Sequence, residues 1–115
     1  MRLNQGSISW DRAELLTQLT GEDSVVRTFP DDPRQLTRVL ARQLHDSKPV
    51  LVSSRAPHYD DEIMPFDLED SHAYELVAVS DDKFVLRNPW NLKHPEAMRP
   101  SEFAANMQPF YATLK

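Results

Sequence analysis

The chain has 115 residues, which predicts a single domain spanning residues 1–115, or one lobe of a larger domain. Its 40% hydrophobic and 27% charged residues are typical of a globular protein, and its net charge of -5 argues against a nucleic-acid partner, because phosphate binding relies on lysine and arginine. No apolar run approaches the roughly 20 residues of a membrane-spanning helix, and no apolar segment that could act as a signal peptide follows Met1. We therefore expect a soluble protein without a membrane partner, either cytoplasmic or secreted as part of a larger protein.

Two helices are predicted in the first half of the chain. The first begins at Ser9 as N-cap and ends at Gly21, a residue type that suits a helix C-terminus. The second has Asp32 as N-cap and Pro33 as its first residue, and its apolar residues share one face: Leu36, Val39, Leu40 and Leu44. The apolar segment 50–54 that follows is predicted to be a short buried strand.

Residues 55–71 form a long loop rich in aspartate and glutamate. It could gate a cleft beside His72 and favour basic substrate residues, or it could be a solvated surface loop. Two strands, 73–80 and 83–87, follow as a hairpin, and a short helix begins at Pro100 ahead of a tail. This order predicts an α+β fold, with a small antiparallel sheet or partial barrel and flanking helices.

The register of the hairpin decides which side chains share a face, because a slip of one residue sends every side chain to the other face. A two-residue connection at positions 81–82 would place His72 and Asn88 on opposite faces of the hairpin. A three-residue connection at 80–82 would place them on the same face, one diagonal step apart.

The three-residue connection also pairs Glu75 with Arg87 across the strands, an opposite-charge pair worth up to about 1 kcal/mol. It gathers apolar side chains on one face: Tyr74, Leu76, Phe84 and Leu86. We therefore predict this register, in which His72 and Asn88 approach within hydrogen-bonding distance if the strands bend or bulge slightly.

A histidine paired with an asparagine is a known arrangement for general base catalysis. The amide oxygen accepts a hydrogen bond from one ring nitrogen and thereby leaves the other nitrogen to take a proton from a thiol. Trp90 could cover this hydrogen bond and exclude water. The alternative is a half-buried strand histidine and an asparagine that turns the chain into Pro89.

His72-Ala73-Tyr74, a strand, a turn and Leu86-Arg87-Asn88-Pro89-Trp90 together resemble the HAY and RNPW segments of the calpain-like cysteine peptidases, which have a papain-like fold. The resemblance implies that His72 is the catalytic base and that Asn88 orients it, with Trp90 and Tyr74 in supporting roles. It also implies a papain-like half-domain, no cofactor, and a protein or peptide as substrate.

The chain departs from the family in three places. Ser71 and Asn91 stand where the family usually has glycine, in GHAY and NPWG. The nucleophilic cysteine of the family lies upstream on the other lobe, and the present sequence has no cysteine. Without a thiol to deprotonate, His72 cannot support formation of an acyl-enzyme, so the chain alone is expected to have no peptidase activity.

Two interpretations remain open. The chain is the His/Asn lobe of such a peptidase, similar to compact bacterial toxin or effector domains, whose partner is a Cys-bearing N-terminal lobe or second chain. Alternatively, it is a binding or regulatory module that retained the fold without catalysis.

Two further kinds of site are less favoured by the sequence. A metal site at His58, Asp60, Asp61 or His72 lacks the usual HxxxH or HExxH spacing, so no metal is expected. Ser53 and Ser54 do not lie in a nucleophile elbow and are predicted to end their strand. His45 and His94 lack matched partners and are expected at the surface.

Overall fold

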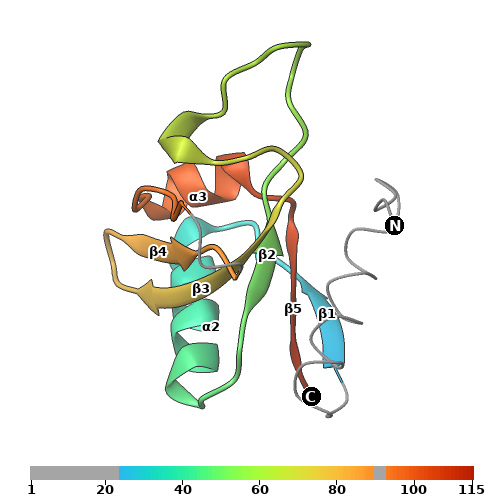
Figure 1. Ribbon diagram of the computed structural model, residues 1–115. Helices are drawn as coiled ribbons and strands as arrows, with labels where there is room; N and C mark the ends of the chain where they lie inside the picture. The colour runs from blue at the N-terminus through green and yellow to red at the C-terminus, as the bar shows by residue number, and fades with distance from the viewer. Residues whose placement is uncertain (1–23, 90–92) are drawn as a thin grey trace.

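The computed structural model describes residues 24–89 and 93–115. They form a five-stranded antiparallel sheet in the order β1-β5-β2-β3-β4, with two α-helices packed beside it (Figure 1). The strands are β1 (Ser24–Thr28), β2 (Leu51–Ser53), β3 (Ala73–Val79), β4 (Phe84–Arg87) and β5 (Phe110–Leu114), and the helices are α2 (Pro33–His45), α3 (Pro100–Asn106) and the 3-10 helix η2 (Pro65–Asp67). The predicted α+β class is therefore confirmed, while the helix predicted from Ser9 to Gly21 lies outside the described residues.

Helix α2 forms where the local signals place it. The Asp32 side chain accepts a hydrogen bond from the Arg34 N–H at 3.2 Å, and Pro33 occupies the first helical position, where its missing N–H costs no hydrogen bond. The helix buries Leu36 and Leu40. The N-terminal signals thus define where the helix begins, and its amphipathic pattern defines the face that it turns towards the core.

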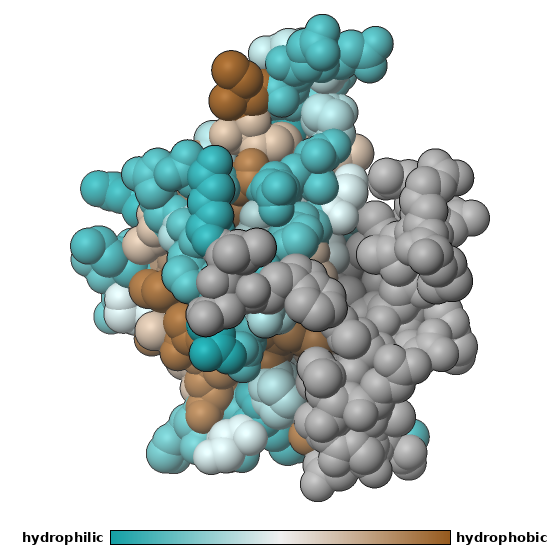
Figure 2. Space-filling view, in the orientation of Figure 1, coloured by the Kyte–Doolittle hydropathy of each residue, from teal (hydrophilic) through white to brown (hydrophobic). Residues whose placement is uncertain are grey.

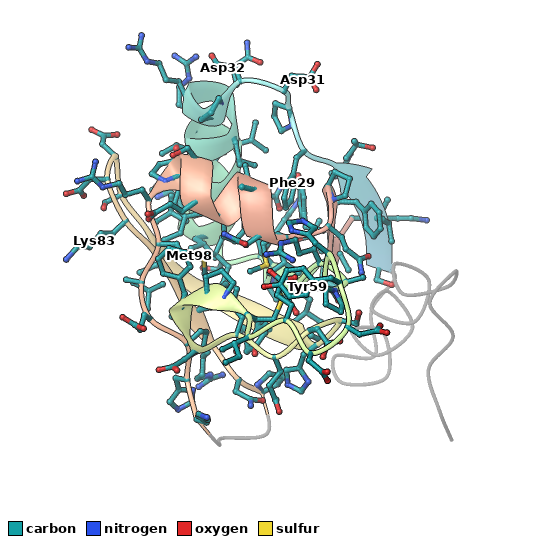
Figure 3. The ribbon with its side chains drawn as sticks, turned by 90° about the horizontal axis from the view of Figure 1, so that it is seen from above. Phe29, Asp31, Asp32, Tyr59, Lys83 and Met98 are labelled. Atoms are coloured by element: carbon teal, nitrogen blue, oxygen red, sulfur yellow. The ribbon has the colours of Figure 1, made fainter. Side chains whose placement is uncertain are left out.

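The main core lies between the helices and one face of the sheet. Phe29, labelled in Figure 3, follows β1. Its ring stacks on Phe103 of α3 and on Tyr111 of β5, with ring centroids 5.6 and 6.0 Å apart. The four apolar residues predicted to share one face of the hairpin are all buried: Tyr74, Leu76, Phe84 and Leu86. In contrast, the loop between β2 and η2, which projects beyond α3 in Figure 1, has a mostly hydrophilic surface (Figure 2).

The hairpin contains both registers considered from the sequence. Glu75 pairs with Arg87 as predicted, and their side chains form an ion pair. Nearer the turn, however, Val79 pairs with Phe84, which is the register of a two-residue connection, so the prediction of a three-residue connection is wrong there. An irregularity between Leu76 and Ala78 accommodates the difference, because a β-bulge adds one residue to one strand.

Two strands were not predicted. Strand β1 pairs with β5, and β5 also pairs with β2 through Leu51 and Ala112. The C-terminal segment, expected to be a tail, is therefore an interior strand of the sheet, with Tyr111, Ala112 and Thr113 buried. In the part of the chain that the structure describes, no helix has the length and apolar character needed to cross a membrane.

Candidate active site

His72 and Asn88 lie together at one end of the β3–β4 hairpin. His72 immediately precedes β3 and Asn88 immediately follows β4, so antiparallel pairing brings them to the same edge. The ring nitrogen Nε2 of His72 is 3.3 Å from Oδ1 of Asn88, and Asn88 is buried with 4% exposure. The structure therefore has the contact between the His72 and Asn88 side chains that the hairpin register predicted.

This contact determines which ring nitrogen of His72 carries the proton. An amide oxygen only accepts hydrogen bonds, so Nε2 must carry the hydrogen that it donates to Asn88. In the neutral ring Nδ1 is then the unprotonated nitrogen and the one able to take a proton. The arrangement is chemically suited to a general base that acts through Nδ1.

Tyr74 supports His72 from the same face of β3. The two rings meet edge to face, with centroids 4.9 Å apart and an interplanar angle of 69°. The Tyr74 hydroxyl oxygen accepts a hydrogen bond from the Glu69 N–H at 2.9 Å, and burial raises the pKa of this hydroxyl above 10.0. Tyr74 therefore contacts the ring and anchors the turn that precedes it.

Ser54 joins the end of β2 to the same turn. Its side chain is fully buried, and its Oγ accepts a hydrogen bond from the His72 N–H at 3.0 Å while donating to the carbonyl oxygen of Glu69. The backbone of Ser54 also donates to the His72 carbonyl oxygen at 3.0 Å. Since its hydroxyl bonds to backbone groups and not to the imidazole, Ser54 is placed as a support of His72 and not as a nucleophile.

Glu69 lies on the side of the ring that faces away from Asn88. Its Oε2 atom is 3.8 Å from Nδ1 of His72, and its side chain is 64% exposed compared with 24% for His72. The acidic loop thus places one carboxylate directly beside the nitrogen that is free to act as base.

His94 is exposed, as expected, but it has a partner that the sequence did not indicate. Its Nδ1 atom accepts a hydrogen bond from the Asn88 N–H at 3.1 Å. The backbone of Asn88 is therefore held by one histidine while its side chain contacts another. No spacing rule links positions 88 and 94, so no local pattern of residues predicts this contact.

The first part of the acidic loop is held by an ion pair. Arg55 donates two hydrogen bonds of 3.1 Å to the carboxylate of Glu62, and it also donates to Oδ1 of Asn106 in α3 at 3.2 Å. The hydrogen bonds from Arg55, and then one from the His58 N–H, lower the pKa of Glu62 to about 2. Residues 55–62 are thus tied to the domain, and Tyr59 in this segment is 66% exposed.

Other predicted or possible sites lie elsewhere. Trp90, predicted to shield the His72–Asn88 contact, lies outside the described residues. Among the described residues no group of three or more acidic or histidine side chains could hold a metal ion. A surface hollow of about 400 Å³ lies at the turn end of the hairpin, away from His72, and is lined by Pro33, Arg34, Thr37, Arg38, Asp81 and Pro100.

Comparison with protein-family models, curated proteins and solved structures finds no match to this chain.

Proposed function

We propose that this chain is the His/Asn lobe of a calpain-like cysteine peptidase, with His72 as general base, Asn88 as the residue that orients it and Tyr74 in support. The observation that carries the proposal is the 3.3 Å contact between Nε2 of His72 and Oδ1 of Asn88, which reserves Nδ1 for proton transfer. The nucleophilic thiol comes from a partner lobe or second chain, since these 115 residues contain no cysteine.

In the assembled enzyme, Nδ1 of His72 takes the thiol proton, and the thiolate attacks the carbonyl carbon of a peptide bond. His72 then returns the proton to the leaving amine, and a water molecule hydrolyses the acyl-enzyme with His72 again acting as base. Asn88 holds the ring in the required tautomer throughout these steps.

The backbone of Ser71 gives additional support. The calpain-like motif usually has glycine at this position, and Ser71 has a φ angle of 50°, in the left-handed region that favours glycine. The turn before His72 therefore has the conformation for which the glycine of the motif is suited, although this chain carries serine there.

The base function can be tested within the chain, because any introduced cysteine is its single thiol. Glu69→Cys places a thiol beside His72, and Asp81→Cys places one in the exposed turn at the other end of the hairpin. Iodoacetamide should alkylate the Glu69→Cys thiol about 5-fold faster when His72 is present than in the His72→Ala background, because a neighbouring imidazole favours the thiolate. The rate at Asp81→Cys should not depend on His72.

A non-catalytic binding or regulatory module is the second candidate, favoured by the absence of cysteine. Equal alkylation rates of Glu69→Cys with and without His72, in folded proteins, would favour this module over the peptidase lobe. Far-ultraviolet circular dichroism of each variant establishes that the proteins compared are folded.

A further inference from the structure

The Glu69 carboxylate is available to a ligand. Its 3.8 Å separation from Nδ1 of His72 exceeds the length of a hydrogen bond. Within residues 24–89 and 93–115, no group donates a hydrogen bond to this carboxylate. Its oxygens therefore retain their capacity to accept hydrogen bonds from an incoming group.

The backbone of Glu69 is held on both sides by buried hydroxyl groups. The Tyr74 hydroxyl accepts from its N–H at 2.9 Å, and the Ser54 hydroxyl donates to its carbonyl oxygen. Both anchoring side chains have 0% exposure. The carboxylate is therefore presented from a positioned backbone, which lowers the entropic cost of binding a ligand.

The basic side chain of Arg55 is already paired with another carboxylate. The Arg55 carbonyl oxygen accepts from the Ser71 N–H at 3.2 Å, which places Arg55 beside the turn, but its guanidinium is paired with Glu62. The side chains of Arg55 and Glu62 are only 15% and 10% exposed, so this pair is largely removed from solvent. Arg55 therefore does not neutralise Glu69, and the exposed Asp70 adds negative charge next to it.

The position of Glu69 relates it to the substrate. Because Asn88 occupies Nε2 of His72, the thiol and the bond to be cleaved must approach Nδ1, where Glu69 lies. We propose that Glu69 is a specificity-determining residue that selects peptides with arginine or lysine next to the cleaved bond. This inference rests on the proposed function and names its substrate class.

Arginine is expected to bind better than lysine, because its planar guanidinium can donate two parallel hydrogen bonds to one carboxylate. The interaction is also expected to weaken with added salt, since the Glu69 side chain is 64% exposed.

The test compares two small probes that differ in charge but have nearly the same shape: the N-acetyl methylamides of arginine and of citrulline. Binding is followed by nuclear magnetic resonance through the amide signals of Ser71 and His72. We expect the arginine probe to bind with a millimolar dissociation constant and the citrulline probe at least about 5-fold more weakly. Glu69→Gln should abolish this preference, whereas Asp81→Asn, which removes an equal charge at the other end of the hairpin, should retain it.

The inference would be overturned if the wild type bound the two probes equally, or if Glu69→Gln and Asp81→Asn showed the same preference for arginine. The alkylation experiment separates this failure from failure of the proposed function. If alkylation depends on His72 but the arginine probe is not preferred, the base role of His72 stands and the proposed selection of basic residues by Glu69 is wrong. An arginine preference without His72-dependent alkylation overturns both proposals, because it leaves only a cation-binding carboxylate beside an inactive histidine.

Discussion

Ser54 and His72 are joined by two hydrogen bonds across the end of β2: the Ser54 N–H donates to the His72 carbonyl oxygen, and the His72 N–H donates to Ser54 Oγ, each at 3.0 Å. The position of the proposed base is therefore set by a different strand from the one that follows it in the sequence. The Ser54 hydroxyl also donates to the Glu69 carbonyl oxygen. One buried side chain therefore positions both His72 and Glu69, the residue beside Nδ1 of His72.

Ser54→Ala should destabilise the protein and loosen His72. Removing the hydroxyl leaves the His72 N–H and the Glu69 carbonyl oxygen without this partner, at a cost of about 1–3 kcal/mol in the free energy of unfolding. The His72-dependent acceleration of alkylation at Glu69→Cys should fall towards 1-fold. Both quantities can be measured, by urea unfolding and by alkylation rate.

Thr113→Val is the matched control for Ser54→Ala. Thr113 is also fully buried, and its hydroxyl contacts Gln43 and the carbonyl oxygen of Pro49, remote from His72. Its loss should lower stability by a similar amount without changing the acceleration. If both variants reduced the acceleration equally, general destabilisation would explain the effect and the positioning role of Ser54 would be wrong.

Ser71→Gly should stabilise the turn before His72. A side chain at a φ angle of 50° crowds the backbone, and glycine lacks the Cβ atom responsible. The comparison with Ser71→Ala isolates this effect, because both changes remove the hydroxyl. We expect the glycine variant to be more stable than the alanine variant by about 1 kcal/mol in thermal or urea unfolding. An alanine variant as stable as the glycine variant would show that the left-handed backbone carries no cost here.

His94→Ala should weaken the orientation of Asn88. The Asn88 N–H loses the acceptor that lies 3.1 Å away, but because the His94 side chain is exposed, its removal lets water reach this N–H, so the loss of stability should be below about 1 kcal/mol. The His72-dependent acceleration should nevertheless decrease, because Asn88 then holds the imidazole less firmly. His45→Ala, a change at another exposed histidine, is the control and should leave the rate unchanged. Equal rates in the two variants would remove His94 from the site.

Glu62 should make stability depend on acidic pH. Its pKa is lowered from 4.5 to about 2 in the folded protein, so below pH 4.5 the unfolded state binds more protons at this site. Its contribution is present above pH 4.5 and is lost as the pH falls towards 2. The difference in stability between wild type and Glu62→Gln, measured by urea unfolding from pH 6 to pH 2, should therefore shrink as the pH falls. A difference that stays constant with pH would contradict the lowered pKa.

Much of the fold could be predicted where the signals are local. Asp32 and Pro33 define the start of α2, and the 3.6-residue apolar repeat defines its buried face. Likewise, the alternation of apolar residues and the charges of Glu75 and Arg87 specified the part of the hairpin register nearest the site. That part of the register was sufficient to predict that His72 and Asn88 lie together.

The remaining features depend on contacts between distant parts of the chain. Strands β1 and β5 were missed because each is specified by pairing with a segment far away in the sequence, and no local pattern of residues marks the bulge near Val77.

The sequence by itself determined the residue types of the candidate site, its hairpin and its lack of a thiol. Only the tertiary structure decided that Ser54 supports His72, that His94 holds Asn88 and that Glu69 faces Nδ1. The physical reason is that hydrogen bonds from a strand end or a loop depend on where the chain passes in space, which no local pattern of residues encodes.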